Sequence, residues 1–242
     1  MAIQRRVQDI RQLAKDFLDR QGTRWPDDQF LRFLNLANAL VYRAVASADP
    51  SHLLSEARIT YPAGTQSVDL SLAGYLNDPV YKVVSIAVLQ SNAAVSQDNL
   101  PDPFDIVSYD DLHRRYQDGG AAYSDSTGSP LSTMFGALVG NSKLHIAPPP
   151  GSDRYLHIAY VPYWRELTLD GDYCLQKIND AAAVSNRAIP FHDSVLALTI
   201  QFLRANEVNM ELSDVIRLIR GEADATEQNQ GGPMLMGYED PY

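Results

Sequence analysis

The chain has 242 residues, of which 45% are hydrophobic and 21% are charged, so it can bury a core in one elaborate domain or two small ones. Thirty acidic and twenty basic residues give a formal charge of −10, which disfavours a surface that grips nucleic acid by neutralising phosphates. The single cysteine, Cys174, excludes an intramolecular disulfide and a cysteine-based zinc cluster, and we expect it to fill apolar space. No run approaches the roughly 18 apolar residues of a membrane span, so we expect a chain made and kept in the cytosol or in something assembled there.

Two amphipathic helices are expected at the N-terminal end. From Ile3 to about Asp19, apolar residues recur at helical spacing at Ile3, Val7, Ile10, Ala14 and Phe17. After the break at QGTRWPDD, Asp27 or Asp28 suits the N-cap or first turn of a second helix, which Asp49-Pro50 ends. The apolar positions of this second helix are Phe30, Phe33, Leu34, Ala37, Val41, Ala44, Val45 and Ala48.

The middle of the chain is expected to form a sheet. Between about Glu56 and Leu89 the apolar period changes to two, and VYKVVSIAVLQ is β-branched enough for a central strand. A short helix is expected from about Phe104 to Gln117, packed through Val107, Leu112 and Tyr116. The run DGGAAYSDSTGSP is loop-like, and TMFGALVGN then returns to strand.

Residues 143–163, KLHIAPPPGSDRYLHIAYVPY, contain two strand-like runs separated by a proline-glycine turn, which predicts a hairpin. Leu144 and Ile146 alternate with polar or small residues in the first run, and Leu156 and Ile158 do so in the second. Opposed residues of an antiparallel pair share a face. Placing these four residues together would therefore place His145 and His157 together on the other face.

Helical periodicity returns near the C-terminal end. After Trp164 the pattern loosens, and DGDYCLQKINDAAAVSNR leaves a short helix and an extended connection both open. From Ile189-Pro190 the residues Val195, Leu196, Leu198, Ile200, Phe202 and Leu203 leave hardly any polar face, which predicts a helix inside a bundle. A further amphipathic stretch carries Leu212, Val215, Ile216 and Ile219. The final GEADATEQNQGGPMLMGYEDPY is acidic and aperiodic, and we expect it to be extended or disordered in the isolated chain.

This order of elements predicts an α+β fold in which the N- and C-terminal helices form one bundle and an antiparallel β subdomain is inserted between them. Residues 1–54 would supply the N-terminal helices and residues 187–220 the C-terminal helices. Residues 55–186 would form the β-rich insertion with its short helix, and residues 221–242 a flexible C-terminal arm.

Candidate catalytic residues find structural explanations. Acid–base hydrolysis needs two carboxylates about 5 to 10 Å apart across a cleft. The acid pairs Asp27-Asp28, Asp110-Asp111 and Asp170/Asp172 lie where helix capping or turns explain them. The motifs GxSxG, GxGxxG and GxxxxGK[ST] do not occur, so the sequence offers no motif for nucleotide binding or α/β-hydrolase catalysis.

Candidate metal and nucleic-acid ligands are also sparse. His145 and His157 could supply two metal ligands, but no nearby motif supplies a third, so no metal is expected. His192 and Asp193 are adjacent and would not face each other on a helix. The clusters Arg5-Arg6 and Arg114-Arg115 are too small to track a phosphate backbone.

The C-terminal arm carries apolar and aromatic side chains in a segment that is not expected to fold alone: Met234, Leu235, Met236, Tyr238 and Tyr242. Such a pattern suits ordering on a partner by strand addition or groove filling. A plain frayed terminus is an equally open interpretation.

Three stretches of the chain carry a resemblance to a known family. They are WPDDQFLRFLNLANALVYRAV in the second helix, KLHIAPPPGSDRYLHIAYVPYWREL at the end of the β region, and AIPFHDSVLALTIQFLRA in the returning helix. Together they resemble the head-to-tail adaptor, or connector, proteins of tailed bacteriophages, which form a ring beneath the portal. The resemblance covers most of the chain through hydrophobic patterns and turn residues.

The resemblance implies a structural protein of the virion neck, without catalysis or cofactor, that forms a dodecameric ring. Its helices would pack against neighbouring subunits and the portal protein, and its β part would dock the downstream tail or nozzle protein. Genome DNA would pass through an acidic lumen without sequence-specific binding. The arm would reach into the portal, which gives Met234, Leu235, Met236, Tyr238 and Tyr242 a docking role.

Two other functions stay open at this point. A carbohydrate-binding or hydrolytic β module of a phage tail would be a monomer or small oligomer with a concave cleft, aromatic residues and two opposed carboxylates. A metal-binding regulator would use His145 and His157, and bound zinc would support it.

Overall fold

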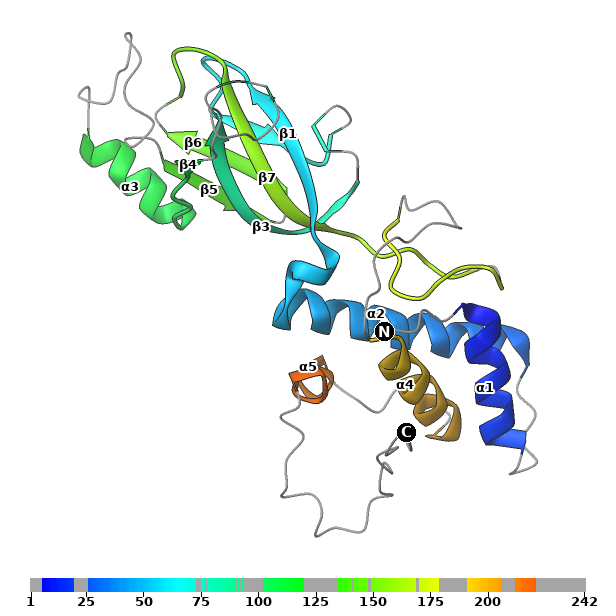
Figure 1. Ribbon diagram of the computed structural model, residues 1–242. Helices are drawn as coiled ribbons and strands as arrows, with labels where there is room; N and C mark the ends of the chain where they lie inside the picture. The colour runs from blue at the N-terminus through cyan, green and yellow to red at the C-terminus, as the bar shows by residue number, and fades with distance from the viewer. Residues whose placement is uncertain are drawn as a thin grey trace, which may run out of the picture.

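The computed structural model describes residues 6–19, 26–72, 75–76, 78–89, 91, 93, 102–119, 135–140, 142–147, 149–168, 170–178, 191–205 and 212–220. These residues form helices and two antiparallel sheets, so the fold is α+β. Figure 1 shows two parts. We call α1, α2, α4, α5 and residues 163–178 the helical layer, and the strands with α3 the β unit. Over the described ranges, no helix is both long and apolar enough to span a membrane.

Helix α1 (Val7–Asp19) buries Val7, Ile10, Ala14 and Leu18. The expectation that Phe17 belongs to the buried face is wrong, because the buried stripe continues through Leu18 and leaves Phe17 52% exposed. The expected start at Ile3 lies outside the described residues. The helix begins at Val7 because Arg6 forms an isolated antiparallel bridge with Tyr173 and the Val7 N–H donates to the Asp172 carbonyl at 2.9 Å.

Helix α2 (Asp27–Ala48) has the predicted bounds, with Asp27 and Asp28 in its first turn, where a negative charge complements the helix dipole. Its buried residues include the expected Phe30, Phe33, Leu34, Ala37, Val41, Ala44 and Val45, and also Asn38, Tyr42 and Ala46. This set is wider than one stripe because α2 is covered on two sides. Figure 1 shows α4 and α5 on one side of α2 and residues 163–178 on the other.

Helices α4 (His192–Ala205) and α5 (Leu212–Arg220) pack against α2. Val195, Leu198, Phe202 and Leu203 of α4 are buried, and the rings of Phe33 and Phe202 lie 6.4 Å apart. Val215 of α5 is buried in the same core. The short 3-10 turn η1 (Pro50–Leu53) follows α2 and leads the chain into the β unit.

The β unit contains two sheets. The first has the strand order β1 (Ser55–Tyr61), β7 (Arg154–Pro162), β3 (Val80–Leu89) and β4 (Asp102–Pro103). The second has the order β2 (Ser67–Asp69), β6 (Lys143–Ala147) and β5 (Phe135–Val139). All strand pairs are antiparallel, and β3 lies inside its sheet as expected.

The predicted hairpin of residues 143–163 is wrong, because β6 and β7 belong to different sheets. Leu144 and Ile146 still face the same core as Leu156 and Ile158, but they do so across two sheets. The turn between β6 and β7 pairs instead with the turn after β1: the Gly64 N–H donates to the Pro150 carbonyl at 2.8 Å. A period of two reports which side of a strand is buried and does not report its partner.

The short helix α3 (Tyr109–Gly119) begins later than the expected Phe104. Residues before it extend the sheets, since the Phe104 N–H donates to the Ile86 carbonyl at 3.3 Å and Ile106 bridges Gly136. Ser108 caps the helix by accepting the Asp111 N–H at 3.1 Å. Leu112 is buried as predicted, whereas the side chain of Tyr116 lies outside the described residues.

Strand β7 joins the two parts of the molecule. Ile158 and Tyr160 lie in the core of the β unit, whereas Val161 lies in the core of the helical layer. The Tyr42 hydroxyl of α2 donates to the Pro162 carbonyl at 2.7 Å, and the Lys177 ammonium donates to the Leu54 carbonyl at 2.8 Å. A continuous strand, one buried hydrogen bond and one half-buried hydrogen bond therefore couple the layer to the β unit.

Candidate interaction site on the helical layer

An open groove of about 980 Å³ lies on the helical layer, between the N-terminal half of α2 and residues 163–178. Leu31 and Leu36 of α2 form one wall, and Tyr163, Trp164 and Ile178 form much of the other. Residues 163–178, which form the second wall, lie on the side of α2 opposite to α4 and α5 (Figure 1).

Two asparagines of α2 hold the second wall in place. The Asn35 amide donates to the Leu167 carbonyl at 3.0 Å and accepts the Leu167 N–H at 2.8 Å. One turn further, Asn38 is fully buried and accepts the Leu175 N–H at 2.8 Å. These amides form hydrogen bonds with backbone groups of Leu167 and Leu175. The irregular segment 163–178 can therefore lie along α2 without leaving these groups unpaired.

Aromatic packing makes the wall at Trp164 rigid. The Trp164 ring centroid lies 5.7 Å from that of Tyr42, 5.8 Å from Tyr81 and 5.7 Å from Tyr163. The guanidinium carbon of Arg43 lies 4.9 Å from the centroid of the Trp164 ring, a distance suited to a cation–π interaction. These contacts hold Trp164 and Tyr163 at the junction with the β unit.

Apolar side chains in the groove remain open to solvent. Leu36 is 37% exposed, Tyr163 37% and Ile178 40%, and all three line this one concavity. Clustered exposed apolar residues bordered by polar ones mark interaction surfaces, whereas single ones are ordinary. The groove therefore has the character of a protein-binding site.

The groove is bordered by charged side chains. Asp28, Arg32 and Glu166 line it and are exposed. None of the three forms an ion pair within the part of the chain that the structure describes. Their charges are therefore available to a partner.

Asp170 and Asp172 have structural partners. Asp172 is fully buried, accepts the Thr168 N–H at 2.9 Å, and its other carboxylate oxygen lies 3.5 Å from Arg165 Nη2. Asp170 pairs with Arg11 of α1 at 3.0 Å. With the bond from Val7 to the Asp172 carbonyl, these contacts attach α1 to the segment that forms the groove.

The other acid pairs lie in first turns, as the sequence predicts. Asp27 and Asp28 open α2, and Asp110 and Asp111 open α3. Asp111 accepts the Ser108 hydroxyl at 2.6 Å. At the start of α4, His192 is buried while its neighbour Asp193 is exposed.

His145 and His157 are not brought together. His157 lies on the four-stranded sheet, with its Nε2 atom 3.6 Å from Glu56 Oε2, whereas His145 lies on the three-stranded sheet. The prediction that they share a face is wrong because it depended on the hairpin. Among the described residues, no group of three histidine, cysteine or acidic side chains could hold a metal ion.

A smaller pocket of about 160 Å³ surrounds His145. The Tyr109 ring of α3 lies 5.0 Å from the His145 ring and 4.7 Å from the His113 ring, both edge-on. The Tyr109 hydroxyl and His113 Nε2 are 2.9 Å apart. Burial, and to a smaller degree the charges of Lys143 and His113, lower the pKa of His145 below its usual range.

The predicted arm residues Met234, Leu235, Met236, Tyr238 and Tyr242 lie outside the described residues, and their docking role stays a prediction. The groove was not predicted from the sequence. Its signal was the pair Asn35 and Asn38, two amides three residues apart within the apolar stretch from Phe33 to Val41. Such amides need partners when buried, so they indicate a segment lying on that face.

No protein-family model matches the chain, and no curated protein matches it. A function is therefore argued from the fold and the groove.

Proposed function

We propose that this chain is a subunit of the head-to-tail adaptor ring of a tailed bacteriophage, a structural protein of the virion neck that joins the portal to the tail. The observation that carries the proposal is the exposed apolar groove, which is lined by α2 and residues 163–178 and, on the side of the β unit, by Pro79. An adaptor needs separate surfaces for its own ring and for the next component. The resemblance of the three quoted stretches supports the same function.

In this proposal the helices act as a bundle that builds the ring, and the β unit docks the tail or nozzle protein below it. The contacts between α2, α4 and α5, together with the common core of these helices, support a rigid ring-building layer. The arm of residues 221–242 extends from that bundle and orders on the portal through Met234, Leu235 and Met236.

The charge of the chain fits a conduit for DNA. A formal charge of −10 per subunit repels phosphates, so a genome would slide past without being held. A dodecameric ring would repeat that charge on every side of the passing DNA.

The test is the mass of the purified protein, alone and mixed with the portal ring from the same virion, by native mass spectrometry or light scattering. A large ring, or a monomer that joins the portal in stoichiometric copies, is expected. Deleting residues 221–242 is expected to abolish joining while leaving the circular dichroism spectrum helical. A monomer that ignores the portal would overturn the proposal.

A matched pair of surface variants distinguishes a contact through the groove from nonspecific hydrophobic association. Leu36→Ser removes an apolar side chain from the groove, and Val139→Ser removes one of similar exposure, 39%, from the β unit. Ring formation is expected to weaken for Leu36→Ser alone. Equal effects of both variants would contradict a ring-building role for the groove.

The alternative, a carbohydrate-binding or hydrolytic module, is the outcome that a lone monomer would favour. The groove does combine Tyr163 and Trp164 with the carboxylates of Asp28 and Glu166. Both carboxylates are exposed, whereas a glycosidase acid is held in an apolar pocket. Glycan-array binding that Trp164→Ala abolishes would establish this alternative.

A further inference from the structure

We infer that residues 172–176, which we call the clasp, are a strained element that opens on its own in the free subunit, and that only the closed clasp presents the groove. The inference rests on the proposed function, because it gives ring formation a conformational control. Opening of the clasp would remove the surface through which the helical layer assembles.

The backbone of the clasp is strained at Leu175. Its φ angle of 60° is the one positive φ outside glycine among the described residues. This left-handed conformation is unfavourable for a residue with a Cβ atom, which approaches the following carbonyl oxygen. Such residues persist only where their surroundings hold them, and they occur at switch regions. The Leu175 side chain is fully buried in the helical core, so its packing holds the strained backbone.

The next side chain adds a second cost to the closed clasp. Gln176 is 1% exposed, and neither Nε2 nor Oε1 of its amide has a hydrogen-bond partner in the described part of the chain. The Nδ2 atom of buried Asn38, whose Oδ1 accepts the Leu175 N–H, also lacks a partner there. A buried amide without partners forgoes the hydrogen bonds that water would give it. Opening therefore returns hydrogen bonds to Gln176 and relaxes the backbone of Leu175.

Apolar burial and polar contacts of Asp172 keep the clasp closed. Cys174 and Leu175 are buried, and the Asp172 carboxylate accepts the Thr168 N–H at 2.9 Å and lies 3.5 Å from Arg165 Nη2. The favourable and unfavourable contributions fall within five consecutive residues. The clasp is therefore less stable than the helices around it, and it can open while α2 and α4 stay folded.

A short antiparallel ladder joins the clasp to the groove. The Arg165 N–H donates to the Gln176 carbonyl at 2.8 Å, and the Ile178 N–H donates to the Tyr163 carbonyl at 3.0 Å. The pair of Tyr163 and Ile178, which lines the groove, thus directly follows the pair of Arg165 and Gln176. When the clasp opens, Ile178 loses its support and the wall of the groove is dismantled.

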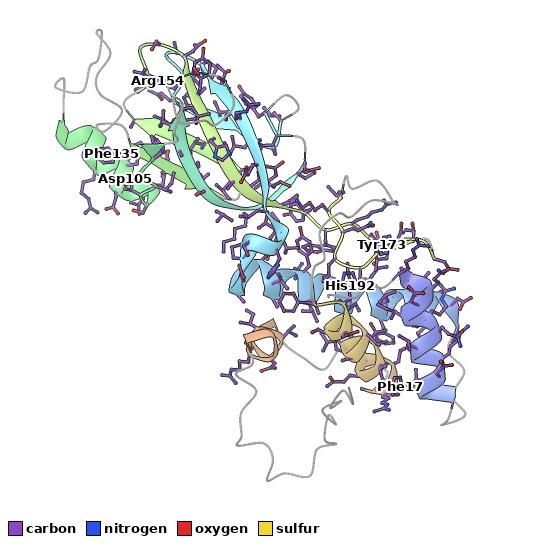
Figure 2. All side chains as sticks on the ribbon, in the orientation of Figure 1. Phe17, Asp105, Phe135, Arg154, Tyr173 and His192 are labelled. Atoms are coloured by element: carbon purple, nitrogen blue, oxygen red, sulfur yellow. The ribbon has the colours of Figure 1, made fainter. Side chains whose placement is uncertain are left out.

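The clasp also holds the start of α1. The Val7 N–H donates to the Asp172 carbonyl at 2.9 Å, and Arg6 forms an isolated bridge with Tyr173. Arg6 Nε donates to the Tyr173 hydroxyl at 2.9 Å. Figure 2 shows Tyr173 beside the start of α1, whereas Phe17 lies at its far end. Opening of the clasp therefore releases the first turn of α1 together with the groove wall.

Cys174 reports the opening without any substitution, because it is the single cysteine of the chain and lies in the clasp. Burial, and to a smaller degree the charge of Asp172, raises the pKa of its thiol to about 12, so the closed clasp does not react with a maleimide. We expect Cys174 of the free subunit to be labelled about tenfold faster than global unfolding permits, with little dependence on dilute urea. Labelling that follows global unfolding, with its full urea dependence, overturns the inference.

Hydrogen exchange in the free subunit tests the link to the groove. The amides of Leu175, Ile178 and Val7 should exchange through one opening, with a free energy of opening below that of the α2 amides. If Ile178 exchanges only with global unfolding while Leu175 opens locally, the clasp does not control the groove and the inference is wrong.

Two variants of Leu175 isolate the backbone strain. Leu175→Gly and Leu175→Ala both remove the buried side chain, but glycine adopts a positive φ freely and alanine does not. Cys174 should be labelled about fivefold more slowly in Leu175→Gly than in Leu175→Ala. Without strain the order would be reversed, because glycine favours the open chain. Equal or reversed rates overturn the inference.

Gln176→Met removes the unpaired amide and keeps a side chain of similar size. It is expected to slow the labelling of Cys174 about tenfold. The control is Gln12→Met, the same substitution at an exposed position of α1, which should leave the rate unchanged. Unchanged or faster labelling of Gln176→Met, with a normal far-UV circular dichroism spectrum, overturns the inference.

The portal ring separates this inference from the proposed function. A ring built through the groove binds only the closed clasp, so mixing the protein with the portal ring should slow the labelling of Cys174 about tenfold. If the protein joins the portal and Cys174 is labelled as fast as before, the adaptor role stands and the control by the clasp is wrong. If native mass spectrometry finds only monomer, the adaptor role is wrong, whereas labelling and exchange of the free subunit still decide whether the clasp opens.

Discussion

The helical layer and the β unit solve the same packing problem in different ways. In the β unit, two sheets close over one core, and hydrogen bonds between neighbouring strands pair their backbone N–H and C=O groups. In the helical layer, an irregular segment covers one side of α2 and is held there by side-chain hydrogen bonds. The β unit closes its core, whereas the layer leaves an apolar groove open.

The buried polar residues show the same difference. Those of the described chain all lie in the helical layer, namely Asn38, Asp172, Gln176, His192 and Thr199. The core of the β unit contains tyrosines as its only residues with polar side-chain atoms. Buried polar groups demand specific partners, so the helical layer should be sensitive to their loss and the β unit to lost volume.

The largest effect is expected from emptying either core. Phe202→Ala in the helical layer should lower the free energy of unfolding by about 3–5 kcal/mol, and Ile158→Ala in the β unit by about 2–5 kcal/mol. Both side chains are fully buried. Because β7 contributes to both cores, we expect one cooperative transition for each variant in urea, followed by far-UV circular dichroism and tyrosine fluorescence. Two separate transitions would show that the parts fold independently.

The second prediction breaks the attachment of residues 163–178. Asn38→Ala leaves the buried Leu175 N–H without its acceptor, and we expect it to cost about 1–3 kcal/mol. Asn35→Ala, in the half-buried wall of the groove, should cost less, because water can reach the freed Leu167 groups. Urea denaturation ranks the two variants. An equal or reversed ranking would mean that burial does not control the strength of this attachment.

Which features could be predicted from the sequence depends on whether they follow from local periodicity or from tertiary contacts. The bounds of α2 and the burial of most of its predicted apolar stripe followed from helical periodicity. The burial of Asn38, Tyr42 and Ala46 did not, because it depends on what covers the second side of the helix. The hairpin of residues 143–163 was wrong, because alternation identified the buried face of β6 and β7 but not their partner strands. Phe17 was misplaced for a related reason: two adjacent apolar residues, Phe17 and Leu18, fitted one stripe almost equally.

The groove could not be predicted, because it exists only where residues 163–178 lie against α2. That segment has no regular period, and its path depends on hydrogen bonds to Asn35 and Asn38 from residues more than 130 positions away. Leu167 and Cys174 fall within the range 55–186 expected for the β insertion, yet they pack in the helical core. Irregular segments take their position from tertiary contacts, which periodicity does not report.

The third prediction concerns a smaller element of the β unit. Ser108→Ala removes the cap of α3 and should lower the free energy of unfolding by about 1 kcal/mol. Ser108→Thr keeps a hydroxyl that can accept the Asp111 N–H and donate to the Asp111 carboxylate, so it serves as the control, with an expected change near zero. Hydrogen exchange of the first turn of α3 should accelerate in Ser108→Ala alone. No acceleration would show that packing of Leu112, rather than the cap, holds the helix start.

The smallest expected effect is a pH dependence at the outer face of the β unit, where α3 meets β6. Burial, Lys143 and His113 lower the pKa of His145 in the folded protein, so below a pH of about 6.5 the unfolded chain binds more protons at this residue than the folded one. The stability that neutral His145 contributes is therefore complete above that pH and is lost as the pH falls below it. We expect urea midpoints to fall between pH 7.5 and pH 5.5.

Replacing His145 isolates its share of that fall. His145→Phe keeps an aromatic ring against Tyr109, 5.0 Å away in the native protein, and removes the titration, so part of the decline should disappear. His157→Phe, on the other sheet and beside Glu56, should leave that part of the decline in place. Hydrogen exchange should locate the acid-induced opening in α3, because Tyr109 and His113 face His145 from that helix. An opening that begins in the helical layer instead would reverse the comparison, since the polar contacts around Asn38 and Asp172 would then be the weaker attachment.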